Sequence, residues 1–187
     1  MALVSENVRV AVTGAVMVGP TSATAPTDAD TPPVGFDDLG YISEDGITET
    51  RERSTDQLRA WQNADVLREV VTEASISFTF RMVETKAETV GLYYGSDVDP
   101  LTGSVAIVPA RTGGRKSFII DVIDGTEYIR IYIPSGEVTE VGDQVYASGE
   151  AIGYEVTITA YPDSRILTDD GQPASVKKFY SSLVATP

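Results

Sequence analysis

Two stretches of this chain alternate in the way that a half-buried β-strand requires, and a long acidic segment without that alternation separates them. The first stretch, residues 8–18, places valines on one face around Gly14: Val8, Val10, Val12, Val16 and Val18. The second stretch, residues 75–82 within a predicted strand at residues 66–83, places large apolar residues on one face: Ile76, Phe78, Phe80 and Met82. Successive side chains of a strand point to opposite faces, so both stretches predict strands with one face in a core.

The segment between these strands is unusually acidic. Between residues 28 and 56 there are nine acids and only two bases, Arg51 and Arg53. The acids are Asp28, Asp30, Asp37, Asp38, Glu44, Asp45, Glu49, Glu52 and Asp56. So long a polar segment is uncommon in a compact domain unless it has a function. We predict an irregular, exposed loop at residues 20–35, which are rich in Pro, Ala and Thr, and a protruding arm at about residues 35–65 that meets another copy of the chain.

Composition excludes several kinds of chemistry. The 187 residues, 42% of them hydrophobic, suit a single domain with its own core. The absence of cysteine and histidine excludes disulfides, thiolate or imidazole metal sites, and Ser–His or Cys–His nucleophiles. Only carboxylates, a lysine or a carboxylate-bound metal remain for an enzyme. We predict no catalytic residue, no metal site and no cofactor.

The charge of the chain bears on its partners. A net charge of −14 does not favour tight DNA binding, which depends on basic residues that release counterions. An acidic surface would instead let DNA pass without adhering to it. Apolar runs are far shorter than the ~18 residues of a membrane span, and Arg9 and Thr13 interrupt the N-terminal run. We therefore expect no membrane anchor, no signal peptide and a cytoplasmic product.

One helix is predicted, at about residues 86–94. Thr85-Lys86-Ala87-Glu88 has the pattern of a capping box, and Gly95 is a suitable C-terminal stop. The second half of the chain predicts strands at residues 103–109, 117–123, 126–133, 151–160 and 177–184. Alternation in two of them predicts a buried face, which consists of Phe118, Ile120 and Val122 in residues 117–123, and of Ile152, Tyr154, Val156 and Ile158 in residues 151–160. Asp124-Gly125 predicts a hairpin turn, residues 136–142 an acidic edge segment, and residues 165–176 a polar loop. The fold class is mainly β: an antiparallel β-sandwich or flattened barrel with one flanking α-helix and a long extended arm.

Few residues suggest a chemical site. Asp97-Val98-Asp99 resembles the start of a calcium loop, but Pro100 follows it and the pattern does not continue. A carboxylate pair could serve a glycoside hydrolase, yet nothing singles out a pair. The single tryptophan, Trp61, is expected to pack in the core or at the base of the arm.

The basic cluster at Arg111, Arg115 and Lys116 opens a strand rather than the helix that a phosphate-binding loop requires. It is either a solvated loop or an inter-subunit patch that meets a neighbour's acidic arm.

Several ordered stretches resemble the major tail protein, the tail tube subunit, of long-tailed (siphovirus-type) phages, especially those of actinobacterial hosts. The stretch that carries the resemblance best is residues 34–47, VGFDDLGYISEDGI. It continues through Ala60-Trp61, residues 78–80, Glu84-Thr85 with residues 92–95, and residues 153–155 with 161–163. The resemblance covers about residues 6–163, and its specificity lies in the ordered set rather than in any one motif.

This resemblance implies a phage tail-tube-like fold, a hexameric ring, and stacked rings that form a hollow tube for phage DNA. It implies that the arm contacts the next ring through Phe36, Leu39, Tyr41, Ile42, Glu44, Asp45, Ile47, Glu49, Arg51, Arg53, Leu58 and Trp61. Glu127 and Glu155 are the candidates that face an acidic lumen. Implied partners are other copies of the chain, a tape-measure protein, a tail terminator and baseplate or initiator proteins, with DNA only in transit. The location would be the virion tail, after synthesis in the bacterial cytoplasm. Because the chain ends at Pro187, we expect no additional immunoglobulin-like domain of the kind that some family members carry.

Three alternatives stay open at this stage. The first is a tail terminator, which caps a tube and need not polymerise, or another tail protein of the same fold. A non-viral surface-binding module would normally carry a signal peptide. A carboxylate-based hydrolase is the remaining possibility.

Overall fold

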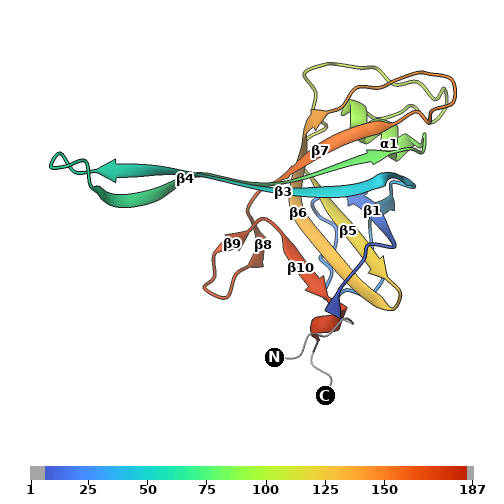
Figure 1. The fold of residues 1–187 in the computed structure, drawn as a ribbon. Coiled ribbons are helices and arrows are strands. Elements are labelled where there is room, and N and C mark those ends of the chain that lie inside the picture. Colours follow the sequence, from blue (N-terminus) through green and yellow to red (C-terminus); the bar gives the residue numbers. More distant parts are fainter. Residues whose placement is uncertain (1–6, 185–187) are drawn as a thin grey trace.

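The computed structural model describes residues 7–184; residues 1–6 and 185–187 lie outside the described part. A body of β-strands with one α-helix carries a long β-hairpin that projects away from it (Figure 1). The elements are β1 (Thr13–Gly19), β2 (Asp37–Asp38), β3 (Ile42–Arg59), β4 (Val66–Met82), α1 (Ala87–Tyr94), β5 (Lys116–Asp124), β6 (Glu127–Val141), β7 (Tyr154–Ala160), β8 (Asp163–Leu167), β9 (Pro173–Ala174), β10 (Lys177–Tyr180) and a 3₁₀ turn at Ser181–Leu183.

Eight strands form one antiparallel sheet in the order β2-β1-β5-β6-β7-β4-β3, and β10 pairs with β6 beside this path. Strands β8 and β9 form a separate two-stranded sheet. The main sheet remains open, because β2 and β3 lie at its two ends. The predicted class, a mainly antiparallel β fold with one flanking α-helix, is confirmed.

Strand β6 contains the bend that folds this sheet into two layers. Its first part pairs with β5, and its last part, Gly136–Val141, pairs with β7. Pro134, which has no N–H, lies at the bend, where the pairing with β5 shifts register. Gly136 is required there, because an added Cβ would lie 2.8 Å from the Phe118 ring and 2.9 Å from Ile158.

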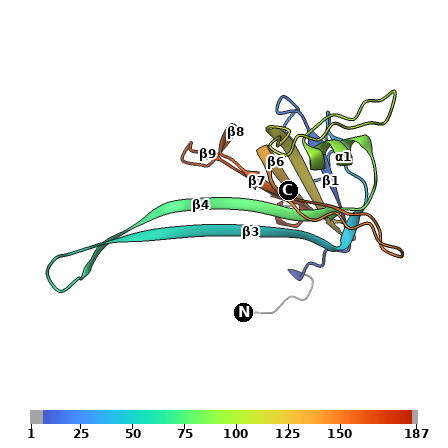
Figure 2. The same cartoon turned by 90° about the horizontal axis from the view of Figure 1, so that it is seen from above.

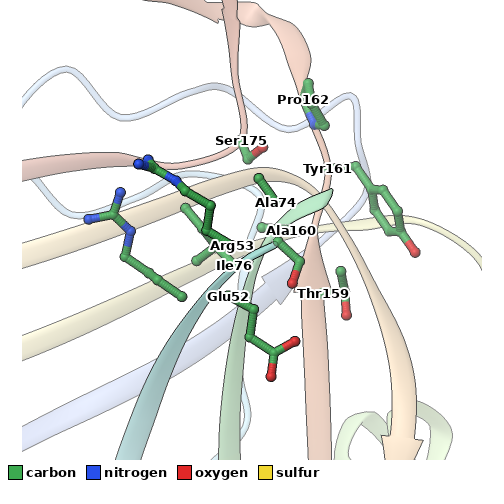
Figure 3. A pocket seen from close by; sticks show the side chains of 11 residues that line it. Glu52, Arg53, Ala74, Ile76, Thr159, Ala160, Tyr161, Pro162 and Ser175 are labelled. Carbon is green, nitrogen blue, oxygen red and sulfur yellow. The ribbon is translucent and has the colours of Figure 1, made fainter. Parts of the chain in front are cut away.

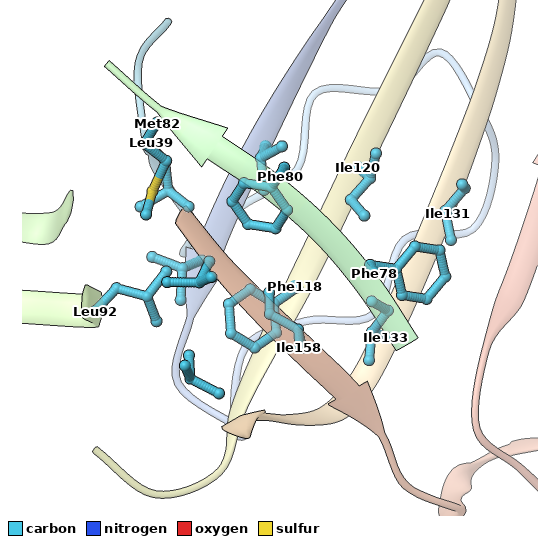
Figure 4. Close-up of a cluster of buried hydrophobic side chains, with 14 of the residues drawn as sticks. Leu39, Phe78, Phe80, Met82, Leu92, Phe118, Ile120, Ile131, Ile133 and Ile158 are labelled. Carbon is cyan, nitrogen blue, oxygen red and sulfur yellow. The ribbon is translucent and has the colours of Figure 1, made fainter. Parts of the chain in front are cut away.

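The core lies between the two layers. Figure 4 shows β4 and β7 crossing over β1, β5 and β6, with apolar side chains between them. The buried members are Val16, Val18, Leu39, Phe78, Phe80, Met82, Leu92, Phe118, Ile120, Ile131, Ile133, Val138, Tyr154, Val156, Ile158 and Ala160. The alternation predicted for β4, β5 and β7 is therefore confirmed, although Ile152 precedes β7 and is 37% exposed.

The loop at residues 20–35 covers the opposite face of β5 and β6. The buried Arg130 donates to both carboxylate oxygens of Asp121 at 2.8 Å and to the backbone carbonyls of Asp28 and Thr31. Ala29, within this loop, is buried. The loop is irregular as predicted, but it is not a freely exposed segment, because the guanidinium ties its backbone to the sheet.

Two predicted strands differ from the structure. Strand β1 begins only at Thr13, and Val8, Val10 and Val12 are 70%, 61% and 70% exposed. Their alternation was sufficient for a strand, but the described part of the body places no layer over them. Residues 103–109 form a loop instead of a strand.

The capping box was also wrong. Lys86 occupies the N-cap position of α1 without a side-chain cap, while the Thr85 hydroxyl shares a 3.1 Å hydrogen bond with the hydroxyl of Tyr154. The Thr85 hydroxyl therefore bonds to a residue of β7 instead of capping the helix. Gly95 ends the helix in the left-handed conformation, φ 63°, as predicted.

Residues 136–142 are not an edge segment, because the last part of β6 pairs with the interior strand β7. The polar loop predicted at residues 165–176 contains β9 and the end of β8, with Ile166 buried against Ile119 and Tyr132. Both differences arise from long-range pairing, which acidic and polar composition alone does not reveal.

Candidate assembly surface

The hairpin of β3 and β4 consists of two parts with different surroundings. Residues Ile76–Met82 of β4 pair with β7 on one side and β3 on the other. Beyond β7, the two strands pair only with each other and run far out from the body (Figure 2). We call this part, residues 53–74, the outer hairpin.

The outer hairpin exposes large apolar side chains. They are Leu58 at 62%, Trp61 at 98%, Val66 at 49%, Leu67 at 65%, Val70 at 44% and Val71 at 50% exposed. An isolated two-stranded hairpin is only marginally stable in water. A hairpin of this composition is therefore expected to be covered by another surface in its functional state.

The protruding segment differs from the predicted arm at both ends. Residues 36–41 belong to the body, where Leu39 is fully buried and its backbone N–H donates to Val16. The return strand, residues 66–74, lies in the protrusion and was missed. The sequence did contain a signal for this return strand. Val66-Leu67 and Val70-Val71 are apolar pairs that do not alternate with polar residues, unlike the buried half of the same strand.

Of the twelve residues predicted for the arm, only Arg53, Leu58 and Trp61 lie on the outer hairpin. Phe36 packs against the second apolar cluster, and Ile42 and Ile47 pack against the main core. The others lie at the start of the hairpin or on its inner part: Tyr41, Glu44, Asp45, Glu49 and Arg51. Glu49 forms a salt bridge with Lys178 of β10, which ties the inner hairpin to the body.

The tip of the hairpin has a defined shape. The Ala60 N–H donates to the Asp65 carbonyl at 2.8 Å, and the Arg59 guanidinium donates to the Ala64 carbonyl at 3.2 Å. Asn63 and Ala64 adopt positive φ angles of 59° and 54°, a conformation that is unfavourable for alanine. Trp61 was predicted to pack at the core or arm base, and this was wrong: the turn directs its ring into solvent.

A pocket lies at the crook where the outer hairpin leaves the body (Figure 3). It has a volume of about 590 Å³. Its walls come from β3, β4, the end of β7 and the segment before β10: Arg51, Glu52, Arg53, Ala74, Ser75, Ile76, Thr159, Ala160, Tyr161, Pro162 and Ser175. We call it the crook pocket.

The outward face of β3, β4 and β7 is polar. Thr79 of β4 lies opposite Thr157 of β7 with a 2.9 Å hydrogen bond between their hydroxyls. Thr159 of β7 shares a 2.8 Å hydrogen bond with Thr139, at the end of the adjoining strand β6. The exposed Glu155 belongs to this face, opposite Arg81.

Glu127 and Glu155, the two acids predicted to face a lumen, lie on different surfaces of the body. Glu127 lies at the β5–β6 turn, where it accepts a 2.7 Å hydrogen bond from the Ser181 hydroxyl and lies 3.9 Å from Arg9. The outer faces of β5 and β6 are covered by the loop at residues 20–35 and by β8 and β9.

The basic cluster is partly engaged with the body. The guanidinium of Arg115 lies 4.1 Å from the centre of the Tyr161 ring and donates to the Ser135 hydroxyl at 3.4 Å. Lys116 begins β5 and is half-buried, while Arg111 is exposed. The cluster opens a strand, as predicted, and whether it meets a neighbour's arm stays a prediction.

Other kinds of site receive no support from the described residues. Within residues 7–184, no group of three or more acids is placed to hold a metal ion. In the same part of the chain, none of the helices has the length and apolar character needed to cross a bilayer.

Of the comparisons with known proteins, one identifies a family and another identifies a fold. A family model described as phage tail tube protein matches residues 1–169. A search of curated proteins finds no match.

Two solved structures resemble the chain in fold. One belongs to the sheath–tube complex of an extracellular contractile injection system (PVC) in the extended state, with 12% identity, a TM-score of 0.51 and 93% coverage of both chains. Another is from the sheath/tube terminator of the PVC system, with 11% identity, a TM-score of 0.54, and coverage of 94% of this chain and 99% of the other.

Proposed function

Because the chain belongs to the phage tail tube protein family, we propose that it is the tail tube subunit of a long-tailed phage, with an actinobacterial host. Six copies form a ring, and rings stack into a hollow tube through which DNA passes into the host. The subunit is made in the bacterial cytoplasm and ends in the virion tail. Its partners are other copies, a tape-measure protein, a tail terminator and baseplate or initiator proteins.

The observation that carries this proposal is the outer hairpin. Its apolar residues, among them Leu58 and Leu67, are exposed in the single chain. A partner that covers this surface removes it from water, which favours association by roughly 25 cal/mol per Å² of apolar area. The outer hairpin of one subunit therefore bridges to the neighbouring ring. A head-to-tail contact of this kind generates open filaments rather than closed dimers.

The polar face of β3, β4 and β7 is the surface we assign to the lumen. Its hydroxyls are paired with each other, as between Thr79 and Thr157, and it carries Glu155. A wall of this kind offers DNA few cations to bind, so the phosphate backbone would pass without releasing counterions. Glu127 is not assigned to the lumen, because it is engaged at the β5–β6 turn.

Electron microscopy of negatively stained protein, concentrated at moderate salt, tests the proposal. We expect hollow tubes of stacked rings. The matched variant replaces residues 55–72 by Asn-Gly, which joins the paired residues Ser54 and Glu73 through a two-residue hairpin turn. It should keep the circular dichroism spectrum of the body and form no tubes. If this variant formed normal tubes, the outer hairpin would not be needed for contacts between subunits, and the proposal would be contradicted.

The second candidate function is that of a tail terminator, which caps a tube. The fold similarity to the PVC sheath/tube terminator is the observation that favours it. Isolated rings that never stack, at any salt or protein concentration, would support this alternative.

A further inference from the structure

The tip of the outer hairpin presents a single aromatic knob. Trp61 is the only tryptophan of the chain, and it is 98% exposed. The tip is fixed by the Ala60–Asp65 backbone hydrogen bond and by the Arg59 side chain, at the cost of a positive φ at Ala64. A strained turn that keeps an indole in water is unfavourable in the isolated chain, so a second surface is needed to account for it.

The crook pocket has the chemistry to accept an indole ring. Ile76, Ala160 and Pro162 supply apolar wall, and its volume of about 590 Å³ lies in the ~300–1,000 Å³ range of ligand pockets. Arg51 and Arg53 also line it. Within residues 7–184, neither guanidinium has a salt bridge. Arginine is a preferred partner for the face of a tryptophan ring.

The occupant of a crook pocket must come from another copy. From Arg53 to Trp61 the hairpin runs as a paired ribbon for roughly 26 Å, at ~3.3 Å per residue, so Trp61 does not reach the pocket of its own chain. Asp65 also belongs to the tip, since its carbonyl accepts the hydrogen bond from the N–H of Ala60, the residue before Trp61. Its carboxylate has the charge that suits the two arginines of the pocket.

We propose that Trp61 of one subunit inserts into the crook pocket of a neighbouring subunit and lies against Arg51 and Arg53. In this contact, the crook pocket is the surface that receives the tip of the outer hairpin. The inference rests on the proposed function, namely assembly between copies of the chain. Knob and pocket lie on different parts of the chain, so each copy offers one of each. The contact is therefore head-to-tail, and between stacked rings it can repeat along the tube.

The single tryptophan makes the contact directly measurable. In unassembled protein, Trp61 should emit as a water-exposed indole and be quenched readily by acrylamide. In assembled tubes, its emission should shift to shorter wavelength and quenching should fall. Tubes whose Trp61 remains as accessible as in the free subunit would overturn the knob-and-pocket contact and leave the tube function intact. The absence of tubes would overturn both.

Engineered cysteines test which surface receives the tip. The natural chain has no cysteine, so every disulfide comes from the introduced pair. A Trp61→Cys subunit mixed with a Ser175→Cys subunit should give disulfide-linked dimers under assembly conditions. The control replaces Leu101, a body-loop residue that is 93% exposed, in a Leu101→Cys subunit mixed with Ser175→Cys. Equal cross-linking in the control mixture would overturn the proposal.

The variant Trp61→Ala measures the contribution of the knob. Truncating a buried interface tryptophan commonly weakens binding by on the order of thirtyfold, and the protein concentration needed for tube formation should rise accordingly. The urea midpoint of the unassembled subunit should not change, because the ring contacts solvent there. An unchanged threshold for tube formation would contradict the proposal.

Discussion

The two halves of β4 share one continuous strand but have opposite surroundings. Phe78, Phe80 and Met82 in the inner half are at most 2% exposed, whereas Val70 and Val71 in the outer half are 44% and 50% exposed. The inner half alternates apolar and polar residues, and the outer half does not. Alternation matches a sheet with one buried and one open face, so its loss where β4 leaves the body indicates a different partner for the outer hairpin.

The body and the outer hairpin therefore have different roles in the proposed assembly. The body has a hydrophobic core of its own between its two layers, which can stabilise the single subunit before assembly. In the proposed assembly, another copy covers the outer hairpin. Changes in the body should therefore alter the free energy of unfolding of the subunit, while changes in the outer hairpin should alter assembly and little else.

The largest effect is expected at Phe78. Phe78→Ala removes a fully buried ring and should lower the free energy of unfolding by about 3–5 kcal/mol. Val70→Ala, in the outer half of the same strand, should change it by less than about 0.5 kcal/mol, because Val70 is exposed at the surface rather than enclosed in the core. Urea unfolding of unassembled protein compares the two. Equal losses would show that the outer hairpin is already packed in the single subunit.

A smaller loss is expected at the bend of β6. Gly136→Ala places a Cβ within 2.8 Å of the Phe118 ring and should cost about 1–3 kcal/mol through overpacking. Gly91→Ala is the control, because it lies within α1 and its methyl would meet only the Ser96 carbonyl, at 3.3 Å. The control should be neutral or slightly stabilising, since alanine favours helix. Thermal unfolding measures both variants. Equal midpoint temperatures for Gly136→Ala and Gly91→Ala would contradict close packing of the two layers at Gly136.

Salt should act on assembly rather than on the fold of the body. Each subunit carries a net charge of −14, and raising the salt from 0.1 M to 1 M shortens the Debye length from about 10 Å to about 3 Å. Repulsion between copies then weakens, and light scattering should show tubes at lower protein concentration. Assembly that weakens as salt rises would instead make the attraction between acidic hairpin and basic residues the dominant interaction.

The smallest effect is expected at Asp163, at the start of β8. Hydrogen bonds from the Arg165 side chain lower the pKa of this carboxyl from its usual 3.8. A lowered folded-state pKa contributes stability above the unfolded-state value, and that stability is lost as the pH falls through the folded-state pKa. Asp163→Asn should therefore reduce stability at neutral pH by less than about 1 kcal/mol, and the difference from the natural protein should shrink below about pH 3.8. A difference that persists unchanged in acid would exclude ionisation as the cause.

Much of the body could be predicted from sequence, because its strands carry local signals. The alternation over residues 75–82 and 117–123 predicted which side chains face the core, and Asp124-Gly125 marked the β5–β6 turn. The valines at 8–12 carry the same signal, yet they are exposed. A local pattern states that one face suits burial, but it does not state what covers that face.

The sequence predicted that a protruding arm exists, but it placed the ends of the arm wrongly. Acidic composition pointed to a protruding segment, but it did not distinguish the outbound strand from the body residues before it, such as Leu39. It also did not show that Trp61 stands at the tip. Both facts depend on the register of β3 against β4, which begins where Ile42 pairs with Met82 and so joins residues far apart in the chain.

By itself, the sequence determined a cysteine- and histidine-free, acidic, mainly β chain with one helix and a polar arm, because composition and alternation are local properties. Only the tertiary structure decided that β6 bends at Pro134 to join two layers, that Arg130 holds the loop at residues 20–35, and that the apolar part of the arm lies beyond the body. These features arise from pairings between distant segments, where the gain from burying apolar surface and pairing backbone groups outweighs local preference.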